Sequence, residues 1–188
     1  MSAILEVNDV SKRFGGLTAV KNVSFALEAG ELTGILGPNG AGKTTLFNLL
    51  TGFIPADTGT IRFEGQELRG LAPYKIVNRG VARTFQLTRP FLGMTVLENV
   101  VVACLSPRAR DAHNKESRAH QLLDQVGLGA KAAEPVETLP YGDLRRLEIA
   151  RALATKPNLL LLDEPFAGLG SSEIEPLAQL IKRINADG

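Results

Sequence analysis

Short β-rich runs come first along the chain, and residues 3–10 alternate with the period of a strand that has one buried face. These runs predict strands over residues 3–10 and 20–27, and a strand with a Gly-Gln turn over 58–68. Residues 32–36 form a short apolar run and predict a buried strand. A small antiparallel sheet is therefore expected near the N-terminal half of the chain.

The apolar period changes to that of helices after residue 86. A short strand is expected at 81–86, and a polar break at 106–114 separates the first two helical segments. Residues 158–165 read NLLLLDEP, a continuous apolar run ended by two acids, as expected of a central parallel strand. Helices are expected from the glycine-rich loop through 46–51, and at 94–104, 116–128, 142–155 and 171–188.

Strands followed by a helical block and a further strand predict an α/β fold with a helical insertion. The 188 residues lie within the usual range of about 100–200 residues for one domain. We expect one domain over 1–188. Residues 1–86 and 156–188 would form a core with a mostly parallel sheet and an N-terminal antiparallel β element, and 87–155 would form a helical subdomain.

Composition and charge exclude several classes of protein. The chain has 21 basic and 20 acidic residues, so no basic tail or stripe predicts a nucleic-acid partner. Cys104 is the only cysteine and cannot form an internal disulfide, which favours a reducing cytoplasm. The first 14 residues lack the apolar segment of a signal peptide, and no apolar run approaches the roughly 20 residues of a membrane span. A role at a membrane would require a membrane-bound partner.

Residues 37–44 read GPNGAGKT and match the phosphate-binding pattern G-x-x-x-x-G-K-[ST] in full. Glycines let consecutive backbone N–H groups curve around an anion, and the N-terminus of the following helix adds a partial positive charge. An ordinary glycine-rich turn between strand and helix is the alternative. The residues expected to bind the nucleotide are Asn39, Gly40, Ala41, Gly42, Lys43, Thr44 and Thr45.

Individual side chains of this motif and of the acidic strand have distinct expected roles. Lys43 can reach the β- and γ-phosphates, and the Thr44 hydroxyl can ligate Mg²⁺. Asp163 would lie beside the Mg²⁺ shell, and Glu164 is placed to polarise an attacking water as general base. Solvated acids at a strand end are the alternative for this pair taken alone. Together the two motifs predict hydrolysis of ATP or GTP.

Five segments resemble, in order, the ATP-binding subunits of ABC transporters: KRFGG, the phosphate loop, RTFQ, LPYGDLRRLEIARAL and LLLLDEP. The resemblance implies that Phe14 stacks on adenine, although a packed core aromatic is the alternative. It implies that Gln86 senses Mg²⁺ and the γ-phosphate, as both a metal ligand and a catalytic residue. It also implies a signature segment whose Tyr141, Gly142 and Asp143 face the ATP of a second subunit.

Residues 14–25, 83–103 and 139–157 are most similar to the ATP-binding subunits of branched-chain amino acid importers. This resemblance implies a homo- or heterodimer of such subunits on two membrane permeases, fed by a periplasmic or extracellular solute-binding protein. The location implied is peripheral, at the cytoplasmic face of the inner (plasma) membrane. The permease contact should include exposed apolar residues, and burial within the helical block is the alternative for these: Phe91, Leu92 and Met94.

The sequence departs from the family at the signature and at its C-terminal end. The signature reads Leu-Pro-Tyr-Gly-Asp instead of Leu-Ser-Gly-Gly-Gln, and Pro140 has neither a hydroxyl nor an N–H to donate. The family continues to a strand with a switch histidine, so a C-terminal part is expected to be missing after Gly188. His113 and His120 precede the acidic strand and are expected at the surface. A truncated module that holds ATP with little or no hydrolysis is therefore the alternative function.

Two adjacent arginines in the helix after the signature could resemble a nucleic-acid patch. We expect Arg145 and Arg146 to lie on a solvated helix face, as paired arginines usually do. Glu148 follows Arg145 by three residues and can pair with it.

Overall fold

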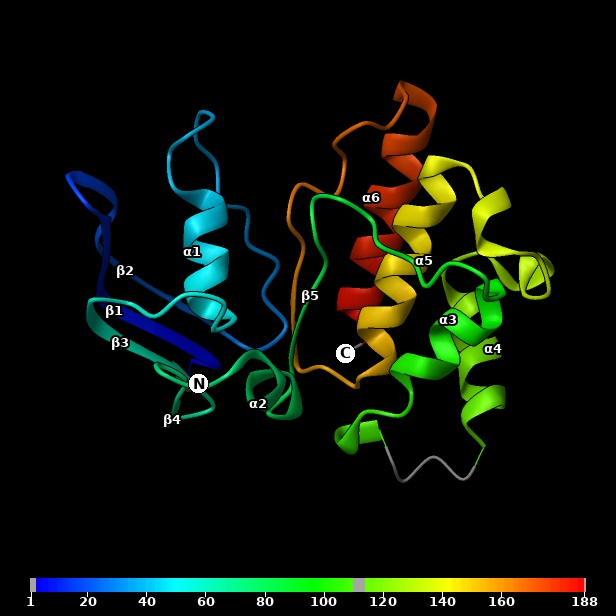
Figure 1. Ribbon diagram of the computed structural model, residues 1–188, viewed down its shortest axis with the longest axis horizontal. Helices are drawn as coiled ribbons and strands as arrows, with labels where there is room; N and C mark the ends of the chain where they lie inside the picture. Colours follow the sequence, from blue (N-terminus) through cyan, green and yellow to red (C-terminus); the bar gives the residue numbers. More distant parts are fainter. Residues whose placement is uncertain (1–2, 110–113, 188) are drawn as a thin grey trace. The chain divides into compact units, whose positions relative to one another are not determined.

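The computed structural model describes residues 3–109 and 114–187, and the chain divides into two compact units. The N-terminal unit comprises Met1–Ile76 with Asn185–Gly188, and the C-terminal unit comprises Val77–Ile184. Both units contain strands and helices, as an α/β fold requires (Figure 1).

A four-stranded antiparallel sheet forms the N-terminal unit, in the order β2-β1-β3-β4. It confirms the expected antiparallel β element. The turn between β3 and β4 is made by Glu64 and Gly65, with φ of 48° and 74°, and not by Gly65 and Gln66. Positive φ at both central residues suits the twist of a two-residue hairpin. The strands are β1 (Leu5–Phe14), β2 (Leu17–Leu27), β3 (Thr58–Phe63) and β4 (Gln66–Glu67).

Two helices belong to the same part of the chain. The expected helix after the glycine loop is α1 (Lys43–Leu50), which contacts β2 and buries three leucines, Leu46, Leu49 and Leu50. A second, α2 (Pro73–Asn78), was not expected, because six residues are too few to display a helical period.

The strand expected at 32–36 is absent, and this expectation was wrong. Residues 31–38 have no ladder hydrogen bonds in the described structure, and Leu36 is 96% exposed. A strand exists only where a neighbour satisfies its backbone groups. The sheet of the N-terminal unit pairs β2, β1, β3 and β4 with one another and leaves this segment outside.

The C-terminal unit holds a parallel strand pair, β5 (Val81–Arg83) and β6 (Leu159–Leu161). Asn158 and Leu159 donate to the carbonyl of Gly80, and Thr84 donates to the carbonyl of Leu161. These bonds fix the register between segments almost eighty residues apart. A parallel strand is confirmed within residues 158–165, but in the described residues its sheet has two strands, so the expected central position is not borne out. The strand expected at 81–86 ends at Arg83.

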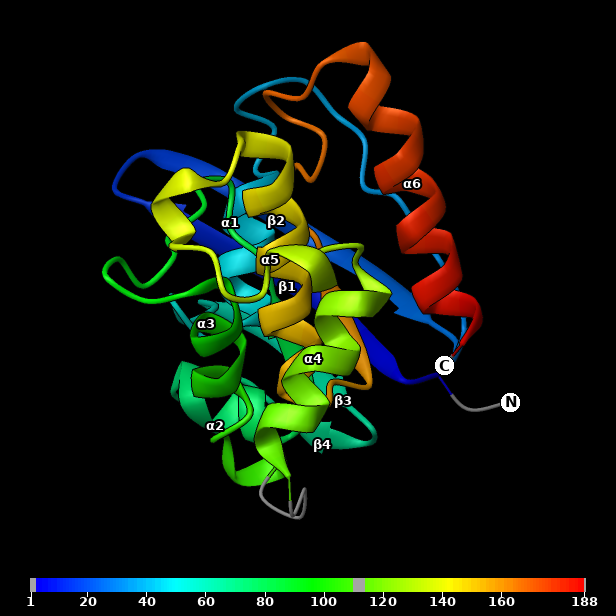
Figure 2. The ribbon, with the colours of Figure 1, turned by 90° about the vertical axis from the view of Figure 1, so that its right-hand side faces the viewer.

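Helices account for most of the C-terminal unit, as the change of period predicted. Three of them contact one another, α3, α4 and α5 (Figures 1 and 2). Their apolar faces form one core with Leu177 and Leu180 of the last helix. The helices are α3 (Val96–Ala103), α4 (Lys115–Gln125), α5 (Tyr141–Ala154) and α6 (Ser171–Ala186), with short 3₁₀ turns at Pro107–Ala109, Gly129–Lys131 and Val136–Thr138.

Candidate functional site

The glycine loop meets α1 at a residue that must be glycine. Gly42 has φ 88°, and its carbonyl accepts the first bond of the helix from the Leu46 N–H at 2.8 Å. A Cβ at Gly42 would overlap the carbonyl oxygen of Ala19 on β2. Both the left-handed backbone and the close approach therefore exclude any side chain here.

Lys43 folds back over this loop. Its Nζ donates to the carbonyl oxygens of Gly37 at 2.6 Å and Pro38 at 2.9 Å. The first turn of α1 contains no acidic residue, so the positive end of the helix dipole is not neutralised locally. The loop residues are exposed through Ala41, and Thr44 is exposed at the first turn. A loop of this kind fits a phosphate group.

Phe14 ends β1 and is 48% exposed, so it is not a packed core aromatic. The ammonium of Lys12 lies 5.6 Å from the centre of its ring. An exposed ring at a strand end has a face available for stacking on a planar ligand.

The two acids that follow β6, Asp163 and Glu164, lie in the C-terminal unit, and Asp163 is buried rather than solvated. Asp163 is 5% exposed, and its Oδ2 accepts from Nη2 of Arg83 at 2.8 Å. Both side chains of this ion pair are buried. Glu164 follows with φ 46°, an uncommon backbone conformation for a residue with a side chain. Such conformations gather at functional sites, where neighbouring contacts hold them.

Gln86 and Glu164 lie together. Nε2 of Gln86 donates to Oε2 of Glu164 at 2.9 Å, across 78 positions of sequence. Gln86 is exposed, three residues beyond the end of β5. The two residues expected to be catalytic are therefore in direct contact.

The signature segment opens α5. Pro140 is the N-cap residue and supplies no side-chain cap, and Tyr141 begins the helix. The Tyr141 hydroxyl oxygen accepts from Nη2 of Arg145 at 2.6 Å. A Cβ at Gly142 would overlap the carboxylate of Glu173 on α6, so this glycine permits a close approach. Asp143 is half-buried.

Lys131 donates to Oδ2 of Asp143 at 2.6 Å. This hydrogen bond raises the pKa of the Lys131 ammonium, because the neighbouring carboxylate favours its charged form. The third expected signature residue is thus already paired within its own chain.

Arg145 contradicts the expectation of a solvated face, because it is only 3% exposed. Its guanidinium donates to backbone carbonyls of residues outside α5, which give no periodic signal in the sequence, and to the hydroxyl of Tyr141, one turn earlier on the same helix. The expected pairing with Glu148 is present, at 3.5 Å. Burial raises the pKa of Glu148, although the Phe85 N–H and Arg145 oppose this shift.

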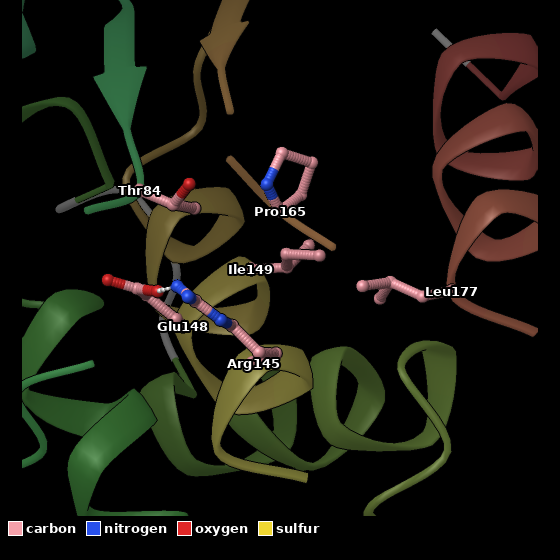
Figure 3. Close-up of a pocket in the computed structure, with 6 residues that line it drawn as sticks. All are labelled: Thr84, Arg145, Glu148, Ile149, Pro165 and Leu177. Atoms are coloured by element: carbon pink, nitrogen blue, oxygen red, sulfur yellow. Dashed lines mark hydrogen bonds and ion pairs between the residues drawn. The ribbon is translucent and has the colours of Figure 1, made fainter. Parts of the chain in front are cut away.

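Arg145 and Glu148 line a small cavity with Thr84, Ile149, Pro165 and Leu177 (Figure 3). Its volume is about 10 Å³, enough for roughly one water molecule. A nucleotide or an amino acid does not fit there. This cavity is therefore not a nucleotide site.

The remaining surface expectations have mixed outcomes. Phe91 and Leu92 are 41% and 72% exposed, and Met94 is half-buried. His120 is exposed as expected, whereas His113 lies outside the described residues. Within residues 3–109 and 114–187, no helix is long and apolar enough to cross a membrane.

Comparison with known proteins agrees with this geometry. The ABC transporter family matches residues 20–167. Over 98% of its length the chain is 43% identical to the high-affinity branched-chain amino acid transport ATP-binding protein BraF of Pseudomonas aeruginosa, of which it covers 78%. Over 96% of its length it is 44% identical to LivG of Escherichia coli (strain K12), which has the same description and of which it covers 76%.

The solved structure of MJ1267, an ATP-binding cassette of an ABC transporter, aligns with this chain with a TM-score of 0.91 and 30% identity. The alignment covers the whole of this chain and 79% of the MJ1267 chain. This likeness confirms the expected fold class, an α/β P-loop NTPase (RecA-like) core with an antiparallel β element and a helical insertion. By sequence and by structure, the chain belongs to the ABC transporter family and is one of its ATP-binding members.

Proposed function

We propose that the chain binds and hydrolyses ATP to power the import of branched-chain amino acids or similar small solutes. The observation that carries the proposal is the glycine loop, in which Gly42 opens α1 and Lys43 lies over exposed backbone. The names of BraF and LivG support the transported substrate. No residue described above would contact a transported amino acid.

The phosphates of ATP would bind at the loop residues Asn39, Gly40, Ala41 and Gly42 and at the first turn of α1, which adds Thr45. Lys43 would exchange its two carbonyl partners for phosphate oxygens. Phe14 would stack on adenine, since its ring is exposed and near a cation rather than packed in the core.

We propose the Thr44 hydroxyl, the Asp163 carboxylate and the Gln86 amide oxygen as ligands of Mg²⁺, because this ion prefers oxygen donors. Bound with ATP, the ion would neutralise charge on the β- and γ-phosphates. In the described residues, no group of three or more His, Cys, Asp or Glu side chains could hold a metal by itself.

Glu164 would act as the general base that orients and polarises the attacking water. Gln86 holds one carboxylate oxygen of Glu164 by its amide, which leaves the other oxygen to accept from a water. Glu164 also has a positive φ, a strained backbone conformation of the kind that gathers at functional sites.

We further propose the partners that such a subunit requires. A second ATP-binding subunit, identical or different, would receive Tyr141, Gly142 and Asp143 at its own nucleotide. Two membrane permeases would contact exposed apolar residues including Phe91 and Leu92, at the cytoplasmic face of the membrane. We propose that residues 87–155 form the helical subdomain of one ATP-binding domain.

Phosphate release from Mg-ATP by the purified chain tests the proposal, beside a Glu164→Gln variant. Removing a general base should lower kcat by about 100-fold or more while ATP still binds. A fluorescent ATP analogue measures binding separately. Binding without turnover in either protein would instead identify a nucleotide-holding module, and absence of binding would refute both readings.

A further inference from the structure

One side of α5 carries three polar residues spaced by three positions, Arg145, Glu148 and Arg151. All three contact the segment that follows β5, residues 85–91, which we name the Gln86 segment. Residues three apart lie on the same face of a helix, so one face of α5 serves as a continuous support for this segment.

Arg145 makes the largest share of these contacts. Nη1 donates to the carbonyl oxygen of Phe85 at 2.8 Å, and Nη2 donates to that of Gln86 at 2.6 Å. The same Nη2 donates to the Tyr141 hydroxyl at 2.6 Å, and the Ala167 carbonyl lies 3.4 Å away. One guanidinium thus joins the Gln86 segment, the first residue of the signature helix and the loop after Glu164.

Further contacts fix the rest of the segment. Oε1 of Glu148 accepts from the Phe85 N–H at 2.9 Å. Nη1 of Arg151 donates to the Arg89 carbonyl at 2.8 Å, and its guanidinium lies 4.6 Å from the centre of the Phe91 ring. From α3, Asn99 accepts from the N–H of Phe91 and donates to its carbonyl oxygen.

Burial makes the Arg145 contacts specific. Its side chain is 3% exposed, and the nearest carboxylate, Glu148, is 3.5 Å away and shared with a backbone N–H. A buried guanidinium is stabilised mainly by hydrogen-bond acceptors placed so that they satisfy its N–H donors. Two backbone carbonyls and a tyrosine hydroxyl at short distance satisfy most of them, so the Gln86 backbone and Tyr141 share one partner, Arg145.

We infer that Arg145 is a positioning residue for ATP hydrolysis, which links the backbone of Gln86 to Tyr141 in the signature helix. It would hold the Gln86 side chain against Glu164 and pass a displacement of the Gln86 segment to the first turn of α5. The inference rests on the proposed function, because it assigns Gln86 and Tyr141 their roles at nucleotides.

Steady-state hydrolysis by the full chain is the first test, with Arg145→Gln compared with Arg146→Gln. Arg146 is the next residue on the same helix and is only half-buried, so it is a matched control. Arg145→Gln should lower kcat by about 10- to 100-fold with little change in KM for ATP, because misplacement of a reacting group affects the chemical step. Arg145→Lys keeps the positive charge but loses the planar set of guanidinium donors, so its kcat should fall between those of the original chain and Arg145→Gln. If Arg145→Gln does not fold, Arg145→Lys takes its place in the comparison.

A double-mutant cycle with Gln86→Ala separates positioning from a general structural role. If Arg145 acts through Gln86, adding Arg145→Gln to a chain that already carries Gln86→Ala should lower kcat by less than about a further twofold. The same fold loss in both backgrounds would overturn the inference, as would an Arg145→Gln variant that matches Arg146→Gln.

Hydrogen exchange tests the link without turnover, so that failure of the proposed function remains distinguishable. A non-hydrolysable ATP analogue with Mg²⁺ should slow amide exchange in 85–91 and in 139–144 of the original chain. In Arg145→Gln the response of 139–144 should be lost while that of 85–91 remains. An unchanged response in the variant, or no response of 139–144 in the original chain, would overturn the inference even if hydrolysis is normal.

Discussion

Lys43 binds neutral carbonyl oxygens of its own loop, and phosphate oxygens would be stronger partners for its charge. We predict that Lys43→Ala weakens ATP binding by about 10- to 100-fold, since a hydrogen bond to a charged group is worth about 1.5–3 kcal/mol. Titration with a fluorescent ATP analogue measures the change. Lys75→Ala removes an exposed lysine from α2 and serves as control, and equal affinity in both variants would refute the assignment of Lys43.

The buried carboxylate of Glu148 has a consequence for the pH dependence of stability. Burial raises its pKa above the ordinary value of 4.5, so as pH rises the unfolded chain releases this proton before the folded chain does. The contribution of Glu148 to the free energy of unfolding therefore falls with rising pH, from about 4.5 until the folded pKa is passed.

Glu148→Gln keeps an oxygen that can accept from the Phe85 N–H but cannot ionise. We predict that the free energy of unfolding of the original chain, minus that of Glu148→Gln, declines as pH is raised from about 4 to 7. Urea denaturation at a series of pH values measures it, with Glu116→Gln on the exposed face of α4 as control. A difference that is constant or increases with pH would contradict the sign.

At the scale of single elements, α3 begins with a capping box. Oγ1 of Thr95 accepts from the Glu98 N–H at 3.1 Å, and Oε2 of Glu98 accepts from the Thr95 N–H at 2.7 Å. We predict that Thr95→Ala lowers the free energy of unfolding by about 1 kcal/mol and Tm by about 2–4 °C. Ser117→Ala on α4 is the control, and calorimetry that finds equal Tm changes in the two variants would count against the cap.

Elements with a strong local period could be predicted from sequence, and elements that depend on remote partners could not. Alternation identified β1, a neighbouring β-rich run identified β2, and helical period identified the long helices of the C-terminal unit. Residues 32–36 have the apolar composition of a strand, but a strand also requires a neighbour in register, and local composition does not specify one.

Site residues follow the same division. The glycine loop could be predicted because its φ angles and close approaches require glycines at fixed spacing. Arg145 could not, because its partners are carbonyl oxygens nearly sixty residues away, and any residue type supplies a carbonyl. Its pairing with Glu148 was visible only because both lie on one helix.

At the scale of the whole molecule, charge is almost balanced and some apolar side chains remain exposed. A net charge of +1 gives little long-range repulsion between copies of the chain. Exposed apolar residues follow Gln86 within the same segment, including Leu87 at 66% and Phe91 at 41% exposure. The segment whose backbone Arg145 holds thus also presents the apolar surface that we assign to the permease contact.

Association of the chain with a second ATP-binding subunit should depend on nucleotide. ATP held by one subunit and contacted by the signature segment of another would stabilise a dimer, and hydrolysis would let the dimer separate. Because Glu164→Gln lacks the general base, this variant should keep its ATP and remain dimeric. We predict that light scattering of Glu164→Gln with Mg-ATP finds twice the mass of a single chain, and that ADP restores the single chain. Glu164→Gln combined with Lys43→Ala, which weakens nucleotide binding, should stay single at the same ATP concentration. A Glu164→Gln chain that binds ATP but never doubles in mass would exclude the homodimer and favour a different subunit as its partner.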